Sequence, residues 1–84
     1  MIEQTSFDDV IRSFKEELNK AIVKHPVWPK DTIHAVNVVS EEAGEACKAA
    51  NDFIYHDGSI DELKTELAHT GAMCIRMLMN LPAK

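Results

Sequence analysis

Three glutamates crowd into five positions near the middle of the chain, where Glu41, Glu42 and Glu45 lie in the stretch VVSEEAGEACKAA. Their neighbours are Val, Ala and Cys, which are residue types suited to burial rather than to a cluster of like charges. A helical wheel, at about 100° per residue, places Glu42 and Glu45 in one sector with the small apolar residues Val38 and Ala49. Two explanations stay open on this pattern: a solvated helix face, and a site for a multivalent cation.

A second group of polar residues follows about two dozen positions later, where Glu66 precedes His69 by one helical turn. If the two segments pair as an antiparallel hairpin through the short connection YHDGS, their midpoints face each other. Glu42, Glu45 and Glu66 can then converge, and no lysine or arginine within a turn of Glu42 relieves the repulsion. Converging carboxylates favour a hard cation, so we expect Mg²⁺ or Mn²⁺. Zn²⁺ is disfavoured because the Cys and His residues do not cluster at zinc-ligand spacing.

Three helices must position these residues. Apolar residues at i, i+3, i+4 and i+7 predict the first helix from about Phe7 to Lys24, with Thr5 or Ser6 as its N-cap. The two prolines of HPVWPK then force an extended connection. We expect the second helix from Asp31 or Thr32 to about His56, and the third over residues 60–80, with Ser59 and Glu62 forming a capping box.

The apolar patterns of the second and third helices predict which faces pack. The main stripe of the second helix consists of Val36, Val39, Ala43, Ala46, Cys47, Ala50, Phe53 and Ile54, and Tyr55 is expected to complete the core beside Phe53. The third helix has one stripe of Ile60, Leu63, Leu67, Thr70, Cys74, Leu78 and Leu81, and a second of Ala68, Ala72, Ile75 and Met79. A helix that is apolar on two sides needs two neighbours.

The composition fits one small all-α domain spanning residues 1–84. The chain is 45% hydrophobic and 27% charged, and it has only three glycines and three prolines. A chain of this length is near the lower limit for folding on a single core. We therefore expect an antiparallel bundle of three main helices per chain that is completed by oligomerisation.

The charge and the cysteines narrow the partners and the compartment. A net charge of −5 argues against a nucleic-acid backbone or an anionic membrane as a partner. No apolar run is long enough to span a bilayer, and the acidic start MIEQTSFDDVIRSF does not resemble a signal peptide. Cys47 and Cys74 lie in apolar patterns without a C-x-x-C unit, which favours buried free thiols in a reducing cytoplasm over a disulfide.

The acidic pattern resembles a known family, the MazG-like all-α nucleoside triphosphate pyrophosphohydrolases. Their signature is E-x-x-E, a spacer, and then E-x-x-D; here EAGE occupies residues 42–45 and ELAH occupies residues 66–69. The likeness is strongest to the short phage- and integron-type members. It runs through WPKDTIHAVNVVSEEAGEACKAANDFIY and ELAHTGAMCIRMLMNL, about two-thirds of the chain. His69 stands where the family signature has Asp. It could bind Mn²⁺, contact a phosphate or a metal-bound water, or play no part in the site.

The resemblance implies hydrolysis of a nucleoside triphosphate between the α and β phosphates, giving a monophosphate and pyrophosphate. The metal ligands would be Glu42, Glu45 and Glu66, with His69 as the departure from the pattern. Bound Mg²⁺ or Mn²⁺ would neutralise phosphate oxygens and make a bound water more acidic, and Glu41 is our first choice to orient or deprotonate that water. Family members form homodimers or homotetramers, so a nucleotide substrate and further copies of the chain are the expected partners.

The remaining substrate contacts are predicted from residue type and position. Lys48, Lys64 and Arg76 are the available phosphate contacts, although each could simply be a solvated charge. Trp28 is the only tryptophan and is either a hydrophobic plug or a stacking surface for a base. The residues that could read base or sugar are His34, Asn37 and Asn51.

Two other functions stay open on the sequence. The chain could be a helical interaction module, such as a small adaptor or an antitoxin-like protein, in which the acids form a charged face. It could also be a family member that binds nucleotide but has lost activity through the change at His69.

Overall fold

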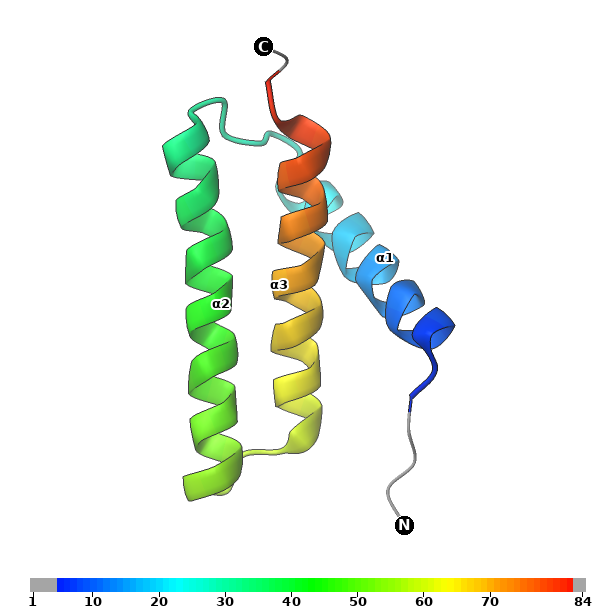
Figure 1. The fold of residues 1–84 in the computed structure, drawn as a ribbon, viewed down its shortest axis with the longest axis vertical. Helices are drawn as coiled ribbons and strands as arrows, with labels where there is room; N and C mark the ends of the chain where they lie inside the picture. The colour runs from blue at the N-terminus through cyan, green and yellow to red at the C-terminus, as the bar shows by residue number, and fades with distance from the viewer. Residues whose placement is uncertain (1–4, 83–84) are drawn as a thin grey trace.

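The computed structural model describes residues 5–82, and this part of the chain contains three helices and no strand. They are α1 (Phe7–Lys24), α2 (Thr32–Tyr55) and α3 (Ile60–Asn80) (Figure 1). The bounds agree with those predicted from the sequence to within about one residue. The all-α class is therefore confirmed.

Each helix begins at a capping side chain, and the sequence predicts the caps of α1 and α3. The side-chain oxygens of Ser6, Asp31 and Ser59 accept hydrogen bonds from the backbone N–H three residues further on, at 3.1, 2.9 and 3.0 Å. These bonds satisfy N–H groups that have no partner within the helix. The helix starts are thus determined by local chemistry that does not depend on the rest of the fold.

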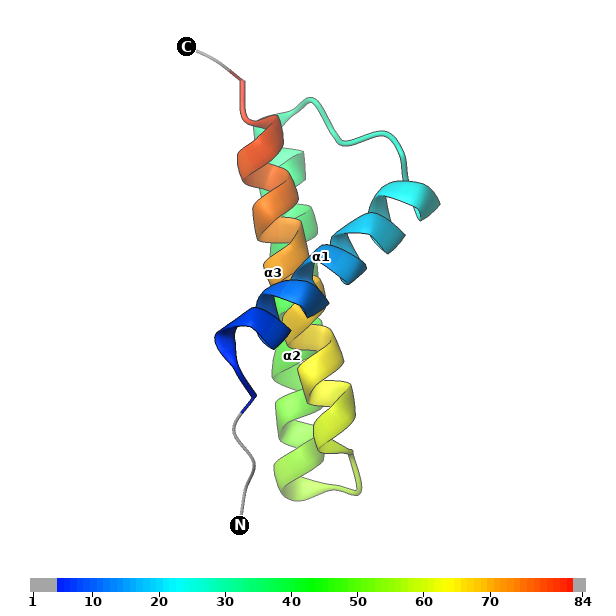
Figure 2. The ribbon, with the colours of Figure 1, turned by 90° about the vertical axis from the view of Figure 1, so that its right-hand side faces the viewer.

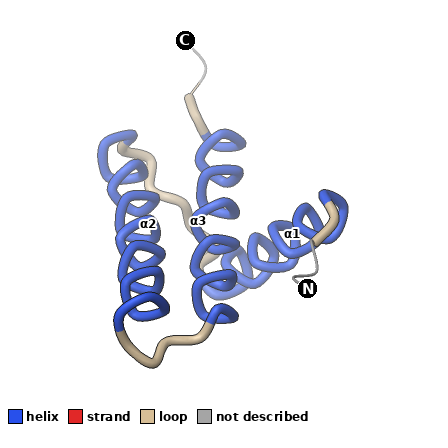
Figure 3. Tube along the Cα trace, turned by 60° about the horizontal axis from the view of Figure 1, so that its bottom comes forward, coloured by secondary structure: helices blue, strands red, loops and turns tan. Residues whose placement is uncertain are grey.

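Helices α2 and α3 form an antiparallel hairpin, and α1 crosses α3 obliquely on its other side (Figures 1 and 2). Within residues 5–82, α1 packs against α3 and makes no contact with α2. Seen from another direction, α1 projects to one side of the hairpin (Figure 3). The prediction that α3 needs two neighbours is confirmed, and the oblique course of α1 leaves a wedge between α1 and α2.

Small residues on α3 allow α1 to approach closely. Ala68 and Ala72 are buried, and Gly71 lies against the ring of Phe14 from α1. A Cβ atom at Gly71 would lie only 2.6 Å from that ring, so glycine is required here by the close approach of the two helices. This contact sets the position of α1 one turn before Glu17.

The buried side of α2 agrees with the predicted stripe only at Ala46. The buried residues of α2 are Ala35, Ala46 and Ala49, so the helix turns a row of alanines toward α3. Alanines permit a short distance between helix axes. The larger side chains of the predicted stripe, including Val36 and Ile54, are exposed instead.

The exposed sides of the hairpin overturn two predictions about burial. Phe53 and Tyr55 do not complete a core within the chain, since both are exposed. Cys47 and Cys74 are free, as expected, but both are exposed rather than buried. The physical reason is the same in each case: these residues lie on sides of the hairpin that no other described helix covers.

The interior of the described chain is small. Besides the five buried alanines named above, its buried residues are Met73 and Arg76, and no large side chain is completely enclosed in the described part. The exposed apolar side chains of the hairpin include Val36, Phe53, Ile54, Tyr55, Ile60, Leu67, Leu78 and Leu81. Among the described helices, none combines the length and apolar character that crossing a membrane requires.

Candidate metal centre and ligand cavity

Glu42 of α2 and Glu66 and His69 of α3 form the only compact group of potential metal ligands in the described residues. One ligand atom from each lies within 4.8 Å of the others, and all three side chains are half-buried. The antiparallel hairpin brings Glu42 and Glu66 together at matching depth, as the sequence predicts. His69 joins them because it follows Glu66 by one turn of α3.

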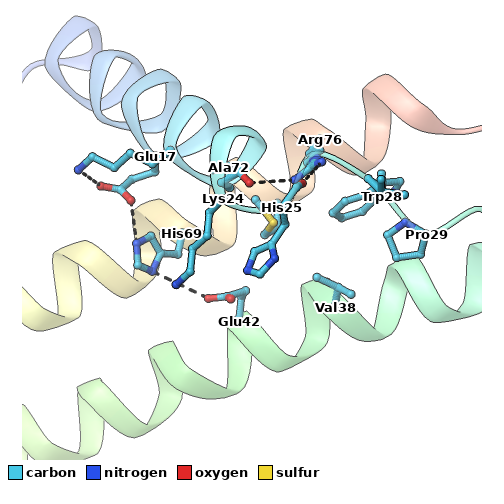
Figure 4. A pocket seen from close by; sticks show the side chains of 14 residues that line it. Glu17, Lys24, His25, Trp28, Pro29, Val38, Glu42, His69, Ala72 and Arg76 are labelled. Carbon is cyan, nitrogen blue, oxygen red and sulfur yellow. Dashed lines mark hydrogen bonds and ion pairs between the residues drawn. The ribbon is translucent and has the colours of Figure 1, made fainter.

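The imidazole of His69 lies between three carboxylates. Its Nε2 lies 2.8 Å from Glu17 Oε2 and its Nδ1 lies 4.0 Å from Glu42 Oε2 (Figure 4). The same Nδ1 lies 3.7 Å from Glu66 Oε2. The distance to Glu17 is short enough for a direct interaction with a proton on Nε2. Nδ1 is thereby directed toward the two glutamates.

Glu17 comes from α1 and was not predicted from the sequence. Its side chain is only 18% exposed, and it reaches His69 because α1 crosses α3 at Phe14 and Gly71. A signal was nevertheless present, because Glu17 lies three residues after Phe14 and four before Ala21, within the apolar stripe of its helix. An acid inside an apolar stripe is the same feature that singled out Glu42.

The donor set fits a hard or borderline divalent cation. Two carboxylates suit Mg²⁺ and Mn²⁺, and the added imidazole favours Mn²⁺. In the described residues, the ion pairs of Glu42 and Glu66 involve only His69, so neither acid is neutralised by lysine or arginine. A metal-binding histidine commonly donates its second ring N–H to a carboxylate, which is the place that Glu17 occupies.

A cavity of about 590 Å³ extends from this cluster along the wedge between α1 and α2. Glu17, Glu42 and His69 line one end of it, and Trp28 and Pro29 of the connecting segment line the other (Figure 4). The other residues that line it are Lys20, Ala21, Lys24, His25, Val27, Val38, Ala72, Met73 and Arg76. The cavity therefore joins a carboxylate end to an aromatic end.

Two lysines of α1 line the cavity and were also missed by the sequence analysis. Lys20 and Lys24 are spaced by one turn, and Nζ of Lys20 lies 3.2 Å from Glu17 Oε1. The sequence offered no way to prefer them over other lysines, because their position depends on how α1 crosses α3. Their charge makes the cavity more suitable for an anion.

Trp28 and Arg76, two of the predicted substrate-binding residues, both line the cavity. Arg76 is 5% exposed and uses two N–H groups on backbone carbonyls at the end of α1. It is therefore built into the wall, and is not a freely extended phosphate contact.

Glu45 and Lys48 lie in a second, smaller hollow between α2 and α3. This hollow has a volume of about 130 Å³, and Glu66 borders it as well. The other residues lining it are Ala49, Asp52 and Glu62. Glu66 thus lies between Glu45 on one side and His69 with Glu42 on the other.

The other predicted site residues lie outside both cavities, namely Glu41, His34, Asn37, Asn51 and Lys64. All five are exposed. The amide of Asn51 donates to the carbonyl of Cys47 on its own helix at 2.9 Å. Within this single chain, nothing brings these residues to the cluster, and their roles stay predictions.

Comparison of the chain with family models, with curated proteins and with solved structures gave no match. What the site can do must therefore be argued from its own chemistry. The cluster can hold a divalent cation, the lysines can attract an anion, and the aromatic end can accept a planar ring. These three capacities lie along one continuous cavity.

Proposed function

We propose that this protein is a metal-dependent nucleoside triphosphate pyrophosphohydrolase that cleaves (d)NTP between the α and β phosphates to (d)NMP and pyrophosphate. The observation that carries the proposal is the cavity that joins the Glu42–Glu66–His69 cluster to Trp28 past two lysines. The MazG-like signature supports the same reaction. We place the enzyme in the cytoplasm, in nucleotide-pool control or in house-cleaning of damaged nucleotides.

The length of the cavity supports a nucleotide bound along it. His69 and Arg76 lie seven residues apart on α3, a rise of about 10 Å along the helix axis. A nucleotide can lie along this span with its phosphates at the carboxylate end and its base near Trp28. Lys20 and Lys24 then flank the phosphates from α1.

Each residue of the carboxylate end has a role in this proposal. Glu42, Glu66 and His69 hold Mg²⁺ or Mn²⁺, and Glu17 fixes the orientation of the His69 ring. The bound cation supplies charge neutralisation for the phosphate oxygens and an acidified water. Glu45 is the further ligand of this proposal, and it lines the second hollow together with Glu66. Glu41 stays our prediction for the carboxylate that orients or deprotonates the water.

The exposed apolar side of the hairpin supports assembly as a homodimer or homotetramer. Leu67 and Leu78 of α3 are 52% and 71% exposed, and the single chain buries little besides alanines. Several large apolar side chains left exposed on one pair of helices favour an interaction surface there. A second hairpin packed on it would give a four-helix arrangement and bury the thiols of Cys47 and Cys74.

The same exposed surface also favours a second candidate function, a non-catalytic helical interaction module. In that case the apolar side would bind another protein, and the acids would form a charged face. A nucleotide-binding protein without activity is the third candidate, because His69 departs from the family signature. These candidates differ in whether the chain binds nucleotide and whether it releases pyrophosphate.

The deciding experiment measures pyrophosphate and orthophosphate separately from a panel of (d)NTPs with Mg²⁺ or Mn²⁺. We expect pyrophosphate from at least one nucleotide and its loss in Glu42→Gln. The matched control is Glu16→Gln on the exposed side of α1. Nucleotide binding without turnover would support the nucleotide-binding protein without activity. If the chain neither binds nor cleaves nucleotides, the interaction module is the remaining candidate.

A further inference from the structure

Arg76 is a buried cation without a carboxylate partner among the described residues. It is 5% exposed, and it forms none of the ion pairs found in this part of the chain. Its Nη2 donates to the carbonyl of His25 at 2.6 Å, and its Nη1 donates to the carbonyl of Ala21 at 3.4 Å. Burying a charged group costs free energy unless it is hydrogen-bonded, and these two hydrogen bonds offset that cost for the guanidinium.

The carbonyls that Arg76 binds belong to the C-terminal end of α1. The carbonyl of Ala21 already accepts the backbone N–H of His25 at 2.8 Å, and this end of α1 carries the negative end of the helix dipole, which favours a cation. Arg76 of α3 therefore closes the end of α1 and fixes the start of the connecting segment that leads to α2. Trp28 lies in this segment, three residues after His25.

The guanidinium of Arg76 also lies over the ring of Trp28. Its Cζ is 5.0 Å from the ring centre, within the range of a cation–π interaction. Both side chains lie at the end of the cavity that is distant from His69 (Figure 4). The ring of Trp28 is half-buried, so Arg76 covers part of it and the remainder lines the cavity.

We infer that Arg76 is a positioning residue that fixes Trp28 as a stacking wall for a planar heteroaromatic ring. The inference rests on the proposed function and makes it more specific: the cavity selects nucleoside polyphosphates over polyphosphates that lack a base. A planar guanidinium can stack on the ring and bind two carbonyls at once, which a lysine ammonium cannot do. Selection of the base thus depends on a residue that need not contact it.

The test uses Trp28 as its own reporter, because it is the only tryptophan of the chain. Arg76→Gln and Arg76→Lys are compared with Arg12→Gln, which changes the only other arginine, an exposed residue of α1 paired with Asp9. In both Arg76 variants we expect stronger quenching of Trp28 fluorescence by acrylamide. We also expect KM for the best nucleotide to rise by about tenfold while kcat changes less. Arg12→Gln should match the wild type in all three quantities.

Inorganic tripolyphosphate separates loss of the stacking wall from general damage. As an inhibitor it needs the carboxylate end and the lysines but not Trp28, so its inhibition constant should stay unchanged in the Arg76 variants. The inference is overturned if quenching and KM stay at wild-type values. It is also overturned if the nucleotide KM and the inhibition constant of tripolyphosphate rise by the same factor.

A second route covers the case in which the Arg76 variants do not fold. Trp28→Phe keeps a ring and should keep the nucleotide KM within a few-fold, whereas Trp28→Leu should raise it about tenfold. If Arg76→Gln folds, adding it to Trp28→Leu should cause no further rise, because both act through one ring. If wild-type protein binds no nucleotide, the proposed function itself fails. If it cleaves nucleotides and Trp28→Leu does so with the wild-type KM, the function stands and this inference fails.

Discussion

Nε2 of His69 on α3 lies 2.8 Å from Oε2 of Glu17 on α1, and this contact joins the first helix to the candidate metal-ligand cluster of Glu42, Glu66 and His69. It determines which ring nitrogen is directed toward Glu42 and Glu66. With Nε2 facing Glu17, Nδ1 is directed to the place where the two other acids converge. His69 thus has an acidic partner suited to orienting it.

Replacing Glu17 should weaken metal binding without removing a proposed ligand. In Glu17→Gln we expect Mn²⁺ affinity to fall by about 10–100-fold, the usual effect of losing a carboxylate that orients a ligating histidine. Calorimetric titration with Mn²⁺ measures this, and Glu16→Gln on the exposed side of α1 is the control. Equal affinities in the two variants would mean that Glu17 does not orient His69.

Replacing both glutamates of the cluster should separate metal binding from folding. Glu42 and Glu66 have no basic partner except His69 in residues 5–82, so Glu42→Gln with Glu66→Gln removes repulsion. We expect the metal-free double variant to unfold at the same or a higher temperature than the wild type. Added Mn²⁺ should raise the unfolding temperature of the wild type but not that of the double variant.

Destabilisation of the metal-free double variant would instead mean that the two acids stabilise the fold. If the double variant is strongly destabilised without metal, Glu42 and Glu66 hold His69 for a structural purpose. If Mn²⁺ stabilises neither protein, the metal site is absent. The matched control is again Glu16→Gln, which removes an exposed acid of α1 outside the cluster and should keep the stabilisation by Mn²⁺.

The helix bounds could be predicted from the sequence because they depend on local chemistry. Ser6, Asp31 and Ser59 cap their helices through bonds that reach only three residues along the chain. The approach of Glu42 to Glu66 could also be predicted from the sequence. A short turn forces an antiparallel hairpin, and the two residues lie at similar distances along the chain from that turn. These predictions needed no knowledge of tertiary packing.

The packed face of α2 and the role of α1 could not be predicted in the same way. The predicted stripe included Ala46 but not Ala35 or Ala49, which α2 also buries because small side chains allow the helices to approach closely. The positions of Glu17 and Lys24 depend on the angle at which α1 crosses α3. That angle is set by the contact of Phe14 with Gly71, a tertiary feature without a local sequence signal.

That contact can be tested with a pair of glycine substitutions. Gly71→Ala and Gly44→Ala both gain helix propensity, up to about 1 kcal/mol each. Only Gly71→Ala also places a Cβ atom 2.6 Å from the Phe14 ring, whereas a Cβ atom at Gly44 meets nothing within 4 Å. Overpacking costs about 1–3 kcal/mol, so Gly71→Ala should be less stable than Gly44→Ala by that amount in urea unfolding.

A second change shows whether the Phe14 ring is the cause. Phe14→Leu removes the ring atoms that the new methyl group would meet, so Gly71→Ala should cost less in a Phe14→Leu background than in the wild type. Equal stabilisation by Gly71→Ala and Gly44→Ala would show that α1 does not cross α3 at this point.

The exposed apolar side of the hairpin predicts that a charge there changes assembly rather than folding. Leu78 is 71% exposed in the single chain, so Leu78→Asp should alter the free energy of unfolding of an isolated chain by less than about 0.5 kcal/mol. If a second copy covers this side, the same change should dissociate the oligomer and expose Cys74, one turn away, to thiol reagents. Sedimentation velocity and the rate of thiol labelling measure the two effects.

Val23→Asp is the control, because Val23 of α1 is 83% exposed and lies outside the hairpin. A wild-type protein that sediments as a monomer, or a Leu78→Asp variant that keeps the wild-type mass, would contradict the dimer.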